Sequence, residues 1–98
     1  MITLDQFNQI VNVNDEEFER ENFNKEVESA ERKGVEEYIR ASRWGNSPKK
    51  WSFTIHGSHK KKFVYELVDE YKKSGYSNVN VIYALSGHEY VWKFILTL

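Results

Sequence analysis

The chain has 98 residues, 40% of them hydrophobic and 15% aromatic, so it is long enough for one packed core and too short for two. It contains no cysteine, which excludes disulfides, thiolate metal sites and cysteine nucleophiles, and it has no apolar run long enough to cross a membrane. The formal net charge of −1 conceals an asymmetry, because residues 1–42 carry a net −6 and residues 43–98 a net +5. We therefore expect one cytoplasmic domain, residues 1–98, with an acidic helical half and a basic half.

The acidic half is predicted to form two helices. TLDQF reads as a capping box, with Thr3 as N-cap and Gln6 three residues later, and this favours a helix of one or two turns. NVND, residues 12–15, then predicts a break. Its polar residues can cap a second, much longer helix that ends near Ser42.

The long helix has an apolar stripe at steps of three and four residues, which predicts that one side packs on the rest of the domain. The stripe consists of Phe23, Val27, Ala30, Gly34 and Tyr38, with Val35 and Ile39 beside them. A mid-helix glycine costs about 1 kcal/mol relative to alanine, so Gly34 indicates either close packing or a bend. Pairs of opposite charge four residues apart are expected on the outer side: Glu21 with Lys25, Glu28 with Arg32, and Glu36 with Arg40. The helix also offers an interface for oligomers.

The basic half is predicted to contain a strand, a helix and two more strands. KWSFTIH, residues 50–56, alternates apolar and polar side chains as a half-buried strand does. Helical spacing follows from Phe63 and stops at KKSG, where lysines and a glycine mark a helix end. Residues 78–85 and 89–98 flank Ser86-Gly87, which suits a two-residue hairpin loop that places Tyr83 opposite Tyr90.

The last strand, residues 89–97, is apolar on both faces, which favours a position at the centre of the sheet. We therefore predict a three-stranded, mostly antiparallel sheet of order 1-3-2, in a split β-α-β arrangement. The whole chain is then an α+β two-layer sandwich of order α-α-β-α-β-β, with the long N-terminal helix packed on one face.

HGSHKKKF, residues 56–63, is the first candidate site. If Ser58 caps the following helix, His59 and three lysines occupy its first turn, where the helix dipole favours negative rather than positive charge. A bound anion would resolve this conflict, and Gly57 would let it approach the backbone. The predicted anion site comprises Gly57, Ser58, His59, Lys60, Lys61 and Lys62.

A second basic group precedes the first strand and is expected to extend this positive surface. It contains Arg43, Lys49 and Lys50, interleaved with Trp44 and Trp51. Cations among aromatic side chains suit nucleic-acid backbones and unstacked bases. The plain alternative is that both tryptophans are buried, the lysines point into solvent, and the two charged halves neutralise each other.

Two further hypotheses remain open. His56 and His59 can serve as acid and base in metal-independent RNA cleavage, which would make the chain a small ribonuclease. Alternatively, the acidic helix imitates spaced phosphates and inhibits a basic protein. The residues of this protein-binding alternative are Glu17, Glu21, Glu28, Glu31 and Glu36.

The sequence lacks a recognised catalytic, metal-binding or phosphate-loop motif, and no cofactor is expected. We therefore interpret the chain as a non-enzymatic small binding protein that acts on nucleic acid or on nucleic-acid machinery, of the kind that phages and mobile elements encode as regulators or inhibitors. Its expected partner is nucleic acid or a nucleic-acid-binding protein, and not a membrane.

Overall fold

The computed structural model describes residues 1–45 and 48–98, with the side chains of residues 12–14 excepted. It contains helix α1 (Leu4–Arg43), strand β1 (Lys50–His56), helix α2 (Lys61–Lys73) and strands β2 (Asn78–Ser86) and β3 (Glu89–Thr97). The predicted α+β class is confirmed. The predicted end of the long helix near Ser42 is also confirmed, since α1 ends at Arg43; residues 46–47, which follow it, lie outside the described part of the chain.

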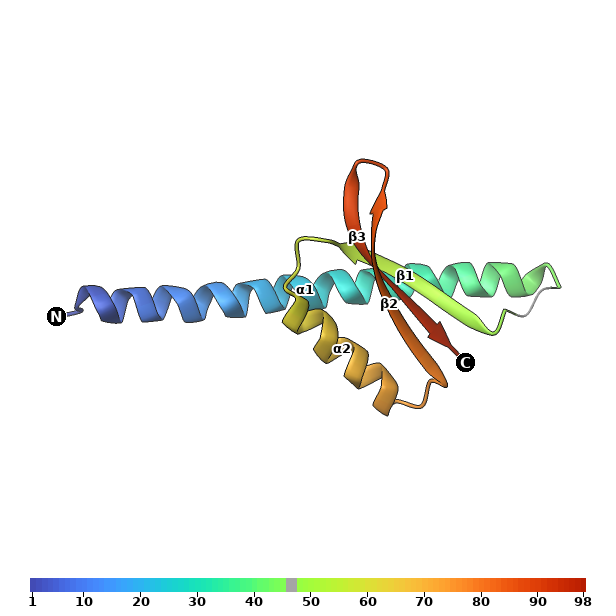
Figure 1. Cartoon of the computed structure of the whole chain (residues 1–98), viewed down its shortest axis with the longest axis horizontal. Coiled ribbons are helices and arrows are strands. Elements are labelled where there is room, and N and C mark those ends of the chain that lie inside the picture. Colours follow the sequence, from blue (N-terminus) through green and yellow to red (C-terminus); the bar gives the residue numbers. More distant parts are fainter. Residues whose placement is uncertain (46–47) are drawn as a thin grey trace.

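The acidic half is one helix rather than two, so the order is α-β-α-β-β and the predicted break at residues 12–15 is wrong (Figure 1). The capping box at the start is present: the Thr3 hydroxyl accepts the Gln6 N–H at 3.2 Å, and the Gln6 side chain accepts the Thr3 N–H at 3.1 Å. NVND contains neither Gly nor Pro. Asn, Val and Asp each cost less than about 0.7 kcal/mol in a helix, which is too little to stop one that is well capped.

The sheet has the predicted order β1-β3-β2 with every pairing antiparallel, so β3 is central. The hairpin register differs from the prediction by two residues, because Tyr83 pairs with Trp92 and Ser86 with Glu89. The loop is therefore Gly87-His88. Gly87 has φ of 64° while His88 does not have positive φ, as in a type II′ turn with glycine in first place. A shift of two leaves each side chain on its predicted face.

Both helices contribute to one core on the same face of the sheet. Phe94 and Leu96 of β3 are fully buried, together with Phe63 and Val64 of α2, and the core extends to Val27 of α1. Phe53 stacks on Phe94 with ring centroids 4.9 Å apart. The predicted packing of the long helix on the sheet is therefore confirmed.

The N-terminal part of α1 projects beyond the sheet (Figure 1). The first buried residue of the helix is Phe23, and the described side chains before Arg20 are all exposed. The molecule accordingly measures 66 × 33 × 19 Å, with a radius of gyration of 17.2 Å. A compact domain of 100 residues has about 13 Å. We call residues 4–18 of α1 the arm.

Gly34 marks the closest approach of α1 to β1. A Cβ atom built on it would lie 2.6 Å from the carbonyl oxygen of Ser52 and 3.0 Å from the Trp51 ring. Real Cβ atoms do not approach a backbone oxygen this closely, so α1 could not lie as near to β1 with any other residue here. Close packing, rather than a bend, thus accounts for the mid-helix glycine.

We predict that Gly34→Ala destabilises the fold although alanine is the better helix former. The gain in helix propensity is about 1 kcal/mol, but the added methyl group must push α1 away from β1, which costs typically 1–3 kcal/mol. Urea unfolding should show a net loss of free energy of unfolding. Ser29→Ala, at an exposed position of the same helix, is the control and should change stability by only a few tenths of a kcal/mol. A Gly34→Ala protein as stable as the parent would show that the contact yields freely.

Candidate functional site

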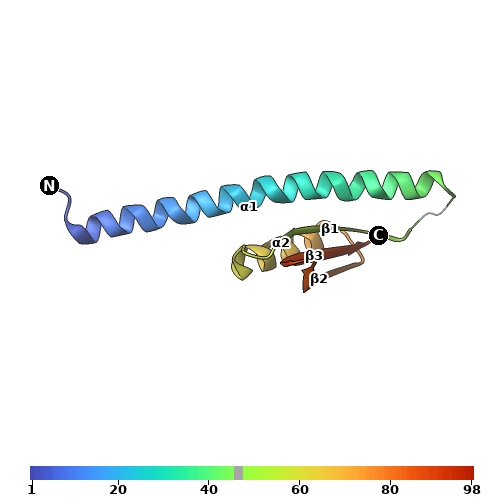
Figure 2. The ribbon, with the colours of Figure 1, turned by 90° about the horizontal axis from the view of Figure 1, so that it is seen from above.

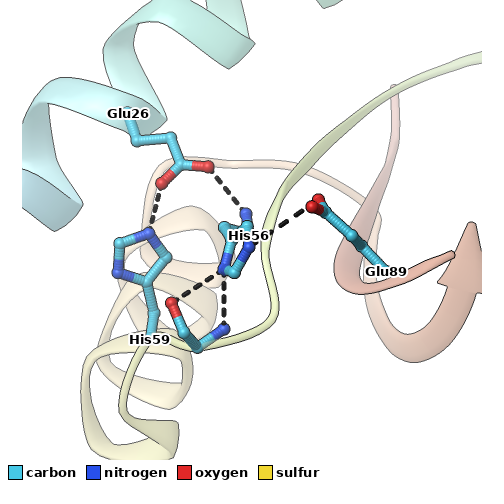
Figure 3. Close-up of polar contacts among 5 residues, drawn as sticks. Glu26, His56, His59 and Glu89 are labelled. Atoms are coloured by element: carbon cyan, nitrogen blue, oxygen red, sulfur yellow. Dashed lines mark hydrogen bonds and ion pairs between the residues drawn. The ribbon is translucent and has the colours of Figure 1, made fainter.

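The stretch HGSHKKKF joins the end of β1 to the start of α2, and Glu26 of α1 holds it in place (Figure 3). One oxygen of the Glu26 carboxylate accepts the backbone N–H of His56 at 2.7 Å, and the other contacts Nε2 of His59. A single carboxylate therefore ties three elements together. Glu26 was not among the predicted site residues, because its partners lie about 30 positions further along the chain.

His59 faces α1 rather than solvent. Its side chain is only 13% exposed, and its ring lies edge-on to Phe23 with centroids 5.2 Å apart. Burial by itself raises the pKa of the Glu26 carboxyl group, but the hydrogen bonds from His59 and from the His56 backbone outweigh it, and the pKa is lowered. Acid–base work on RNA would need His56 and His59 to reach one phosphate. This arrangement directs His59 inward instead.

Ser58 does not cap α2, contrary to the prediction. Its hydroxyl lies 2.7 Å from Nδ1 of His56, and its backbone N–H also donates to that nitrogen at 3.2 Å. Because a backbone N–H can only donate, Nδ1 is an acceptor, and the hydroxyl donates to it as well. The N-cap of α2 is Lys60, whose side chain forms no capping bond. Helix α2 begins two residues later than an N-cap at Ser58 requires, so the serine side chain bonds within its own turn instead.

His56 also approaches Glu89 at the start of β3, with Nε2 3.7 Å from the carboxylate (Figure 3). Serine, histidine and carboxylate thus follow one another as a nucleophile, its base and an orienting group do in some hydrolases. All three side chains are exposed, with His56 at 51% and Glu89 at 71%. A contact between neighbours in a turn, open to water on this scale, is ordinary surface hydrogen bonding.

The lysines of the stretch meet carboxylates of α1. Lys60 lies 2.9 Å from Glu19, and Lys62 lies 3.3 Å from Glu16. The hydrogen bond that Lys60 donates to Glu19 raises the pKa of Lys60. Lys61 is exposed and forms no ion pair with any residue that the structure describes. The charge conflict at the start of α2 is therefore relieved largely by the protein's own glutamates.

Gly57 is required by the sheet rather than by a ligand. A Cβ atom here would lie 2.5 Å from the carbonyl oxygen of Tyr90, and the Gly57 N–H already donates to that oxygen at 2.9 Å. The residue closes β1 against β3. Its backbone N–H is consequently engaged and does not face an approaching anion.

The second basic group lies at the other end of β1. Lys50 begins this strand of seven residues and His56 ends it, so the two predicted parts of the positive surface are about 20 Å apart. At the Lys50 end the Trp44 side chain is 84% exposed, whereas Trp51 packs against the core. Within residues 1–45 and 48–98, Arg43, Lys49 and Lys50 form no ion pair. We call Arg43, Trp44, Lys49 and Lys50 the basic corner.

The five glutamates of the acidic-helix alternative do not form one uniform row. Glu31 accepts the hydroxyl hydrogen of Tyr71 at 2.9 Å; burial, together with this bond, raises the Tyr71 pKa. Glu21 pairs with Lys25 at 3.4 Å, as predicted. Among the described residues, the predicted pairs of Glu28 with Arg32 and Glu36 with Arg40 are not formed. Of these five glutamates, Glu17, Glu28 and Glu36 are exposed and form no ion pair with a described residue.

Comparison of the chain with protein-family models, with curated proteins and with solved structures finds no match. The described residues contain no group of three or more His, Cys, Asp or Glu side chains that is placed to hold a metal ion. In the same part of the chain, neither helix is long and apolar enough to cross a membrane. Functional inference therefore depends on the surfaces described above.

We predict that Glu26→Gln destabilises the protein in a pH-dependent way. A carboxyl group whose pKa is lowered by folding stabilises the fold above its unfolded value, near 4.5, and loses this contribution as the pH falls through its folded value. The variant should be less stable than the parent by about 1–2 kcal/mol at pH 7, and the deficit should shrink below pH 4.5.

Urea unfolding at pH 7 and at steps down to pH 3 measures this effect. Glu17→Gln, an exposed carboxylate on the same helix, is the control and should change little at any pH. A deficit for Glu26→Gln that stays constant with pH would mean that packing, rather than the charge, is responsible.

Proposed function

We propose that the protein is a non-enzymatic binding protein that holds single-stranded nucleic acid at the basic corner. The observation that carries this proposal is Trp44, a large aromatic side chain left 84% exposed between cations that no carboxylate neutralises in the described residues. A ring in this setting offers a stacking surface to an unstacked base, while the flanking cations contact phosphates.

The backbone on both sides of the corner is fixed. Trp44 is the C-cap of α1; its N–H donates to the carbonyl group of Ala41 at 3.2 Å, and the Gly45 N–H donates to that of Ser42 at 3.3 Å. On the β1 side, the carbonyl oxygen of Lys49 accepts the N–H of Leu98 at 2.7 Å. The C-terminal end of a helix dipole repels phosphate, but Arg40 and Arg43 in the last turn offset that repulsion. Backbone hydrogen bonds therefore hold both Trp44 and Lys49 in place.

The stretch HGSHKKKF supports nucleic-acid binding less well. Lys60 and Lys62 already contact glutamates of α1, and His59 is turned inward. Lys61 remains available as a supplementary phosphate contact. The acidic-helix alternative is also weakened, because two of its five glutamates, Glu21 and Glu31, are engaged within the fold.

The proposal gives the chain the role of a small nucleic-acid-binding regulator, such as a phage or mobile element would encode. A binding surface without a pocket suits a protein that covers a strand or recruits it. Stacking on one indole accepts any base, so the binding should show little sequence preference.

We predict that Trp44→Ala weakens binding of a mixed-sequence single-stranded oligonucleotide. Base stacking on an aromatic side chain contributes about 1–3 kcal/mol, so the dissociation constant should rise about tenfold or more. The double variant Lys49→Glu, Lys50→Glu should also bind more weakly. Its plot of log affinity against log salt should be flatter by about 0.7 for each lost phosphate contact.

Fluorescence anisotropy of a labelled oligonucleotide at several salt concentrations gives both quantities. Lys72→Glu, Lys73→Glu is the matched control, since it reverses two adjacent lysines of another element, α2, that are not part of the basic corner. If both double variants weakened oligonucleotide binding equally, the effect would reflect the net charge of the protein and not the basic corner. A parent protein that does not bind the oligonucleotide at low salt would overturn the proposal.

A further inference from the structure

Helix α1 carries a second apolar stripe, separate from the one that packs on the sheet. Its residues follow one another at steps of three and four, with a repeat of seven, and every described side chain along it is exposed. The apolar members, which we call the seam, are Leu4, Phe7, Val11, Phe18, Val35 and Ile39. Between the two ends of the seam, the same repeat is occupied by charged residues: Glu21, Lys25, Glu28 and Arg32.

Most of the seam lies on the side of α1 that faces away from the domain, whereas Val35 lies at the domain's flank and lines a hollow together with Trp51 of β1. At 3.6 residues per turn, the seam's mean direction is roughly 160° from that of the buried stripe containing Phe23, Val27 and Gly34. Figure 2 shows the sheet and α2 on one side of α1 and nothing on the other along the whole helix. The domain, as it packs on the buried stripe of α1, therefore leaves the seam uncovered.

The arm needs a covering partner for its own stability. It is not buried by the domain, and it contains Asn at several positions and the β-branched Ile10 and Val11, which are weak helix formers. Isolated helices shorter than about 12–15 residues are marginal in water. Apolar residues with a seven-residue repeat are the pattern by which one helix packs along another.

We propose that a second copy of the chain covers the seam, with the two α1 helices packed antiparallel as a coiled coil. In an antiparallel coiled coil, each a position of the heptad faces a d position of the other helix. In this register Phe7 faces Ile39 of the second copy and Val11 faces its Val35. Each contact occurs twice, because a two-fold dimer repeats its interface. The two domains then lie on opposite outer sides of the helix pair and do not collide.

The charges of α1 select this orientation. In the antiparallel register Glu21 faces Lys25 of the second copy, so the exposed pair that these residues form within one chain, 3.4 Å apart, extends across the interface. A parallel pair would set Glu21 against Glu21 and Lys25 against Lys25. It would also bring together two segments, residues 1–19, that each hold five acidic and no basic side chains. The antiparallel pair instead sets those acids beside residues 27–45, where four basic side chains balance four acidic ones, so this repulsion is avoided.

Sedimentation equilibrium of the full chain tests the dimer. The parent should be dimeric at micromolar concentration, and its helix content by circular dichroism should rise with concentration as the arm is covered. Phe7→Glu, Val11→Glu should weaken the dimer about 100-fold or more, because each substitution removes two apolar contacts and places two carboxylates in the seam. Unchanged unfolding of the sheet would show that the variant still folds.

Leu85→Glu is the matched control, because it replaces an equally exposed apolar residue of β2 by glutamate. It should leave the dimer intact. A parent that stays monomeric would overturn the proposal and leave the seam to a different protein. A dimer that Leu85→Glu dissociates and the arm variant does not would overturn it in favour of pairing through β2.

Introduced cysteines settle the orientation, since the chain has none of its own. Phe7→Cys mixed with Ile39→Cys should form an intermolecular disulfide under mild oxidation, and Phe7→Cys alone should not. Disulfide formation by Phe7→Cys alone would indicate a parallel pair and contradict the charge argument. These experiments need no nucleic acid, so their outcome is independent of the basic corner.

Discussion

The Glu26 carboxylate is the contact on which the rest of the structure depends. It reaches from α1 to the end of β1 and to the start of α2 at once, through the His56 backbone and the His59 ring. With His59 drawn toward α1, the first turn of α2 lies beside Glu16 and Glu19, and its lysines find carboxylates there. The position of this one carboxylate thus explains why the charged stretch HGSHKKKF serves largely to hold α1 and α2 together.

This use of charge explains the asymmetry between the two halves of the chain. The acidic half and the basic half neutralise each other where α1 passes α2, about halfway along the helix. At the far end of β1 the cations have no such counterpart among the described residues, and an exposed indole stands between them. A charge that the fold does not use for itself is the better indicator of a binding surface, which is why the proposal has moved from Lys60–Lys62 to the basic corner.

The fold was predictable where the signal was local and its physics unambiguous. A strand that is apolar on both faces is favoured at the centre of a sheet, and β3 is central. Gly34 indicated close packing or a bend, and close packing is what the structure shows. The prediction failed at NVND because weak helix formers alone do not stop a capped helix. It also failed at Ser58, because α2 begins two residues later than a cap at Ser58 requires. Neither Glu26 nor the burial of His59 was accessible, because both depend on contacts between residues some 30 positions apart. The seam was hidden for another reason, since the core stripe of the same helix accounted for its most regular apolar spacing.

The two proposed surfaces have a geometric relation that neither has alone. The basic corner lies at the C-terminal end of α1, a helix of 40 residues and therefore about 60 Å long. An antiparallel pair sets the two corners at opposite ends of this rod, on separate copies and outside the seam. A short oligonucleotide can reach only one corner, whereas a strand long enough to span the rod can engage both, and the second contact then profits from the high effective concentration that the first creates. The affinity of the dimer should consequently rise steeply once the strand exceeds the length of the helix pair. In a monomer, affinity would grow only in proportion to the number of overlapping sites on the strand, so the dependence on strand length carries the signature of the assembly.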